Sequence, residues 1–190
     1  MTAPEPLNGV VTVGTDHHRF DRLMDWLERW DAANPGAVRW IVQHGSSRPM
    51  AGAEGFTIKP RADVLELLLN ADVVVTQGGP GGIKDSRECG AVPIVVPRLA
   101  RLDEVVDDHQ VAFTQQLARK GLVVAAESEA ELHAALDRVL ADPAEFRADA
   151  TTSDVTETVR RFSAAVAEML ASKPVRPSRW RRPVTGTPSR

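Results

Sequence analysis

Three short segments contain the residue types that bind phosphates and sugars. The first is TQGGPGG (76–82), the second is VGTDHHRF (13–20), and the third is DEVVDDHQ (103–110). Glycine has no Cβ, so a phosphate can approach the backbone N–H groups of such loops closely, most readily where a helix begins. The acids, imidazole and amide of the third segment are groups that hydrogen-bond sugar hydroxyls.

Each segment also has a purely conformational explanation. Glycine-rich turns between a strand and a helix occur without any ligand, and Asp107 or Asp108 could act only as a helix N-cap. Neither glycine segment matches the GxGxxG pattern of dinucleotide-binding loops or the GxxxxGK[ST] pattern of P-loops. Those two modes of nucleotide binding are therefore disfavoured.

Apolar runs alternate with helical patterns, which predicts the elements that position the three segments. We expect strands at 9–14, 38–43, 55–58, 72–77, 92–97 and 122–126, with helices between them and one helix starting near Ile83. This alternation implies an α/β fold, a Rossmann-like parallel sheet with helices on both faces. Ligands of such sheets bind beyond the carboxyl ends of the strands, so all three segments are expected to face the same sheet edge.

The composition divides the chain into three parts. Residues 1–150 are expected to form the Rossmann-like domain, 151–172 a helix with an apolar stripe that could dock a partner, and 173–190 a disordered tail. The tail has six basic residues and no acidic ones, whereas the other 172 residues carry 17 basic and 26 acidic side chains, a net charge of −9. Such a tail either contacts an anionic membrane or only aids solubility, and the acidic globule argues against nucleic-acid binding.

The cellular compartment can also be predicted. The chain has a single cysteine, no apolar run of the roughly 18 residues that a membrane helix needs, and no secretory signal at its start. We therefore expect a cytoplasmic protein.

Single residues suggest specific roles. Asp85 is expected near the start of a helix, where it either complements the helix dipole or grips the two hydroxyls of a ribose, and Glu88 is its alternative. His17 and His18 are adjacent in the sequence and are not expected to face one metal ion together. Because there is also no DxD pair at a strand end, we expect no metal. One of the two histidines, with His17 as the candidate, could contact a phosphate or act in catalysis.

With these elements in order, the chain resembles the C-terminal, donor-binding domain of the GT-B glycosyltransferases, of the family 28 type. The resemblance is carried by VTVGT with FDRL, by ADVVVTQGGPGGI, by VPIVVPR and by VDDHQ, and it extends from about residue 10 to 143. It is most similar to single-domain catalytic subunits that work with a separate membrane-associated subunit. These are the subunits of bacterial exopolysaccharide glycosyltransferases and of the eukaryotic dolichol-linked N-acetylglucosaminyltransferase.

The resemblance implies a set of binding residues and an activity. The diphosphate of a UDP-sugar would be lined by the loop residues Gly14, Thr15, Gly78, Gly79, Gly81 and Gly82. Asp85 would bind the ribose, in place of the family's glutamate, and His109 with Gln110 would reach the sugar. The implied activity is transfer of the sugar, with inversion and without a metal cofactor, to a lipid-linked acceptor.

The resemblance also implies a partner and a place in the cell. A membrane-associated subunit would bind the acceptor, so the protein would work at the inner face of the membrane. There are two alternatives to a glycosyltransferase subunit. A chain of this length is too short for a two-domain sugar-nucleotide epimerase. A non-catalytic regulatory subunit with a degenerate nucleotide-sugar site stays open, because Asp85 is one methylene shorter than glutamate and LDEV (102–105) is acidic.

Overall fold

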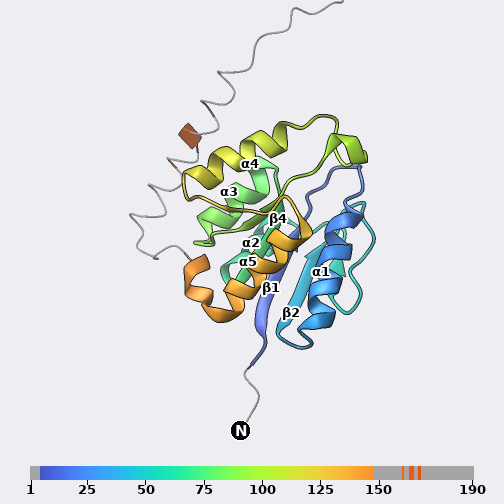
Figure 1. Ribbon diagram of the computed structural model, residues 1–190, viewed down its shortest axis with the longest axis vertical. Helices are drawn as coiled ribbons and strands as arrows, with labels where there is room; N and C mark the ends of the chain where they lie inside the picture. The colour runs from blue at the N-terminus through green and yellow to red at the C-terminus, as the bar shows by residue number, and fades with distance from the viewer. Residues whose placement is uncertain (1–4, 148–159, 161–162, 165–166, 168–190) are drawn as a thin grey trace, which may run out of the picture.

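The protein is a parallel sheet covered by helices (Figure 1). The computed structural model describes residues 5–147, 160, 163–164 and 167. Within these residues the strands are β1 (Leu7–Thr12), β2 (Val38–Gln43), β3 (Glu54–Phe56), β4 (Val73–Gln77), β5 (Ile94–Val96) and β6 (Val124–Ala125). All neighbouring strands pair in parallel, in the order β3-β2-β1-β4-β5-β6. The order reverses between β1 and β4, which is the point where ligands bind in open sheets of this kind.

Helices cover both faces of the sheet because its strands are apolar on both sides. The helices are α1 (Asp21–Ala33), α2 (Arg61–Leu69), α3 (Pro80–Glu88), α4 (His109–Arg119) and α5 (Glu129–Ala141). Val11 belongs to a core cluster with residues of α1 and α5, whereas its neighbour Val10 packs with residues of α2 on the opposite face. Val95 of β5 packs with residues of α3 and α4 on that second face. The expected α/β fold with helices on both faces is confirmed.

The start of α3 differs from the sequence-based expectation. The helix begins at Pro80, three residues before the expected start near Ile83. Proline suits the first helical position because its fixed φ is already helical and its missing N–H has no partner there in any case. Gly79 precedes it as the N-cap in extended conformation. The earlier start places Gly81 and Gly82 in the first turn of the helix.

The C-terminal region lies largely outside the described residues. This applies to the predicted partner-docking helix (151–172), apart from residues 160, 163–164 and 167, and to the whole basic tail (173–190). In the part of the chain that the structure describes, no helix combines the length and apolar character that a bilayer crossing requires.

Candidate functional site

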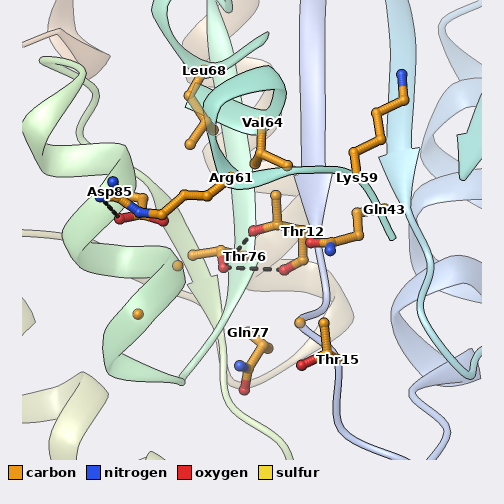
Figure 2. Close-up of a pocket in the computed structure, with 13 residues that line it drawn as sticks. Thr12, Thr15, Gln43, Lys59, Arg61, Val64, Leu68, Thr76, Gln77 and Asp85 are labelled. Atoms are coloured by element: carbon orange, nitrogen blue, oxygen red, sulfur yellow. Dashed lines mark hydrogen bonds and ion pairs between the residues drawn. The ribbon is translucent and has the colours of Figure 1, made fainter. Parts of the chain in front are cut away.

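A cavity opens at the topological switch point, beyond the carboxyl ends of β1 and β4. Its volume is about 290 Å³, and its wall includes the ends of both strands, the loop after β1, the start of α2 and the first turns of α3 (Figure 2). The fold creates this cavity because the crossovers from β1 and from β4 leave the sheet toward opposite faces.

The N-terminus of α3 supplies backbone donors to the cavity. Gly81 and Gly82 both line it. The first intrahelical bond runs from the Ile83 N–H to the Gly79 carbonyl, at 3.4 Å, so the N–H groups of Gly81 and Gly82 precede the hydrogen-bond ladder of the helix. These free N–H groups, together with the positive end of the helix dipole, form an environment that favours an anion.

The two glycines of this turn differ in the space around them. A Cβ atom added at Gly81 would meet no heavy atom within 4 Å, whereas one at Gly82 would lie 2.8 Å from Thr76 Oγ1. Gly82 is therefore required for close packing of the helix on the sheet. At Gly81 the missing side chain leaves open space on the cavity wall.

Two threonines form the floor of the cavity. Thr12 at the end of β1 donates its hydroxyl hydrogen to Thr76 Oγ1 at 2.9 Å, and Thr76 donates to the Thr12 carbonyl at 3.1 Å. Both residues are buried, and Figure 2 shows the two hydroxyl groups meeting between the strands. This pair links the strands at the point where the sheet order reverses.

An ion pair closes the side of the cavity toward α2. Arg61 Nη2 lies 2.7 Å from Asp85 Oδ1 and 3.1 Å from Glu88 Oε2, and Figure 2 shows the arginine reaching across to Asp85. Asp85 lines the cavity, and Glu88 does not. Lys59 also lines the cavity, while its ammonium group lies 4.5 Å from the centre of the Phe56 ring.

The loop after β1 is held in place by a buried arginine. Gly14 takes a left-handed conformation, with φ of 76°, and lines the cavity together with Thr15. Arg98, which is 1% exposed, donates to the carbonyls of Val13 and His18, both at 2.8 Å, and to the Glu104 carbonyl at 2.9 Å. One guanidinium group thus ties the loop after β1 to the loop before α4.

The histidines of this loop differ in their surroundings. The side chain of His17 is 86% exposed, and that of His18 is 15% exposed. His18 Nδ1 lies 2.6 Å from Asp16 Oδ1, and the His18 backbone N–H donates to the same oxygen at 2.8 Å. That backbone hydrogen bond is the main reason why the pKa of the Asp16 carboxyl is lowered. The rings of His17 and His18 lie 4.0 Å apart, with an angle of 38° between their planes.

His109 and Gln110 lie at the start of α4 and do not line the cavity. His109 Nδ1 contacts Asp107 Oδ1, and Gln110 Oε1 accepts the Arg98 backbone N–H at 3.1 Å. Asp108 is the N-cap residue of α4 but makes no side-chain cap hydrogen bond, whereas Asp107 Oδ1 accepts the backbone N–H of His109, the first residue of the helix, at 3.0 Å. Asp108 instead accepts the Ala100 backbone N–H at 2.9 Å.

The structure thus brings together part of the predicted set. The residues that line the cavity are Gly14, Thr15, Gly81, Gly82 and Asp85, whereas Gly78, Gly79, His17, His109 and Gln110 do not. A Cβ at Gly78 would lie 2.9 Å from Gln110 Cβ, and one at Gly79 would lie 2.1 Å from Gln77 Nε2. These two glycines therefore allow close packing beside the cavity.

Sequence reasoning missed the basic residues of the site. Lys59 and Arg61 follow β3, whose carboxyl end lies at the same sheet edge as those of β1 and β4. The rule that placed the glycine segments at that edge also applies to the residues after 55–58, so this signal was present in the sequence.

A family model shows the family of this chain, and solved structures show its fold. A model of the glycosyltransferase family 28 C-terminal domain matches residues 10–166. Similar solved structures include the glycotransferase of kitacinnamycin, which is 22% identical with a TM-score of 0.57 over 90% of this chain and 42% of that one. Acinetobacter baumannii MurG is 16% identical, with a TM-score of 0.54 over 90% of this chain and 51% of its own. Spinosyn forosaminyltransferase SpnP is 15% identical, with a TM-score of 0.54 over 90% of this chain and 44% of its own.

These likenesses define the architecture. The sheet with its helices corresponds to one half of a GT-B fold, and the chain spans about half the length of the solved structures it matches, or less. No curated protein matches the sequence significantly.

Proposed function

We propose that this chain, which belongs to the family of glycosyltransferase family 28 C-terminal domains, binds a UDP-sugar as the donor half of a glycosyltransferase. It transfers the sugar with inversion to a lipid-linked acceptor, in a complex with a membrane-associated subunit that binds this acceptor. The observation that carries the proposal is the cavity at the switch point, which is lined by free backbone N–H groups, by threonine hydroxyls and by the ion pair of Arg61 and Asp85.

The diphosphate is assigned to the N-terminus of α3. Gly81 and Gly82 present N–H groups there, and Gly14 and Thr15 line the same cavity from the loop after β1. Fixed dipoles stabilise the negative charge that develops on the leaving UDP, since they need no reorganisation during the reaction. In this proposal the charge of the leaving group is stabilised without a metal ion.

The ribose is assigned to Asp85. Its Oδ1 is held by Arg61, which fixes the carboxylate at the cavity wall, and Oδ2 accepts hydrogen bonds from the ribose hydroxyls. Glu88 is less suited to this role, since it lies outside the cavity and contacts Lys84 and Arg61.

A partner that supplies the second half of the fold is part of this proposal. The solved GT-B structures are about twice as long as the part that this chain matches. In such enzymes the reaction takes place between two Rossmann-like halves, and this chain provides one sheet. In this proposal the acceptor site lies on the second half, which a membrane-associated subunit contributes. Membrane contact through the basic tail, 173–190, belongs to the same proposal, because clustered arginines bind anionic lipid surfaces.

The proposal is tested by titrating the purified chain calorimetrically with UDP. We expect Asp85→Ala to weaken binding about tenfold or more, because hydrogen bonds to a charged group contribute about 1.5–3 kcal/mol. Asp63→Ala is the matched control, since Asp63 is exposed on α2 outside the cavity and its loss leaves the affinity unchanged.

Three outcomes count against parts of the proposal. If the chain does not bind UDP, it does not act as a donor subunit by itself. If Asp85→Ala binds as tightly as the wild type, the ribose is held elsewhere. UDP-sugar binding without transfer by the complex with its partner would favour a non-catalytic regulatory subunit.

A further inference from the structure

The loop after β1 carries three potential metal ligands on consecutive residues. These are Asp16, His17 and His18, and their donor atoms all lie within 4.8 Å of one another. We propose that these three side chains bind a divalent transition-metal ion such as Zn²⁺. The proposal is independent of UDP-sugar binding and concerns a separate group of side chains.

The distances between the donor atoms lie on either side of the spacing that a metal ion requires. His17 Nδ1 lies 3.6 Å and His18 Nδ1 lies 2.6 Å from Asp16 Oδ1. Bonds of about 2.0–2.1 Å in a tetrahedral site separate neighbouring donor atoms by about 3.3 Å. A metal ion would replace the close contact between His18 Nδ1 and Asp16 Oδ1 by a wider spacing, and the exposed His17 side chain would turn toward them to supply the third donor atom.

The backbone of the loop holds these side chains in their mutual arrangement. The His18 N–H donates to Asp16 Oδ1 at 2.8 Å, which fixes the carboxylate relative to the second histidine. The His18 carbonyl accepts from Arg98, which is buried and also holds the Val13 carbonyl. The loop is therefore anchored at Val13, before the three ligands, and at His18, the last of them.

The type of metal follows from the ligands. Two imidazoles and one carboxylate suit Zn²⁺, Ni²⁺ or Cu²⁺, whereas Mg²⁺ and Ca²⁺ prefer sites made of oxygen atoms alone. Three protein ligands on an exposed loop leave at least one coordination position to water. This is the composition of an open metal site rather than a closed structural one.

The experiment is a titration of the untagged full-length chain with Zn²⁺, read out by competition with a chromophoric chelator. We expect one ion per chain. His17→Ala is a clean variant, since this side chain is 86% exposed, and we expect it to weaken Zn²⁺ binding about tenfold or more.

Asp16→Asn tests the carboxylate without disturbing the loop, because the amide oxygen still accepts the His18 N–H while the negative charge is lost. It is also expected to weaken binding about tenfold or more. His133→Ala is the control for histidine content, since His133 lies on α5 and bonds the Trp26 carbonyl, and we expect unchanged affinity.

The proposal is overturned if the wild type binds no Zn²⁺ at one ion per chain. It is equally overturned if His17→Ala and Asp16→Asn bind Zn²⁺ like the wild type, or if His133→Ala weakens binding as much as they do. The same variants are also titrated with UDP, so that a failure of Zn²⁺ binding and a failure of UDP binding are measured separately.

Discussion

Substitution of Gly81 by alanine separates ligand binding from folding. A Cβ at this position meets no heavy atom within 4 Å, so the methyl group costs nothing sterically in the free protein. Alanine also has the higher helix propensity, by up to about 1 kcal/mol within a helix, and Gly81 lies in the first turn of α3. We therefore expect Gly81→Ala to leave the free energy of unfolding unchanged or to raise it slightly.

The same substitution is expected to weaken UDP binding. The methyl group occupies the open space on the cavity wall through which a phosphate would approach the Gly81 N–H. Loss of one hydrogen bond to a charged oxygen corresponds to about 1.5–3 kcal/mol, or about a tenfold to hundredfold loss of affinity.

Gly82→Ala provides the contrast. Its Cβ would lie 2.8 Å from Thr76 Oγ1, so the helix or the strand has to shift, at a cost of about 1–3 kcal/mol. Urea unfolding and calorimetric titration with UDP are measured on both variants and on the wild type. If wild-type UDP binding is fully retained in Gly81→Ala, the diphosphate does not lie at the start of α3, and the assignment of this turn is refuted.

Two further predictions concern stability. Arg98→Ala removes hydrogen bonds to buried carbonyls and leaves a cavity, so we expect urea unfolding to show a free energy of unfolding lower by on the order of 3 kcal/mol. The control is Arg101→Ala, because Arg101 is exposed and its loss should change the free energy of unfolding little. Equal stability of both variants would contradict the anchoring role of Arg98. The hydrogen bond from Arg48 is the main cause of the lowered pKa of Glu28. Because the folded-state pKa is lowered, the contribution of ionised Glu28 to stability is present above its unfolded-state pKa and is lost as the pH falls through its folded-state pKa. Glu28→Gln should therefore destabilise the protein at pH 7 and have little effect in acid, which thermal unfolding of the variant and the wild type at both pH values measures. If the difference in melting temperature between the two proteins is the same at both pH values, this linkage is disproved.

The fold was predictable because its signals are local. The runs at 38–43 and 72–77 are rich in β-branched residues, which favour strands, and they match β2 and β4 to within a residue. The N-cap of α5 is another local signal, because Ser128 and Glu131 have the spacing of a capping box and the Ser128 side chain accepts the Glu131 N–H. The start of α3 was placed too late, since the low helix propensity of two glycines concealed the preference of Pro80 for the first helical position.

The candidate site was only partly predictable because it combines residues that are distant in the sequence. Asp85 and the glycines of the cavity wall belong to recognisable segments, whereas Arg61 comes within 2.7 Å of Asp85 only when α2 packs beside α3. Likewise, nothing in VPIVVPR indicates that Arg98 turns inward to bond carbonyls 80 and 85 residues away.

The sequence by itself determined the order of strands and helices, and thereby the edge of the sheet at which the glycine segments meet. Tertiary structure decided which of their groups face a common cavity and which pack against a neighbouring helix, as Gly78 does against Gln110. It also brought the rings of His17 and His18 within 4.0 Å of each other. The physical reason is that strand and helix signals repeat over a few residues, whereas the direction of a side chain in a loop depends on the elements that pack around it.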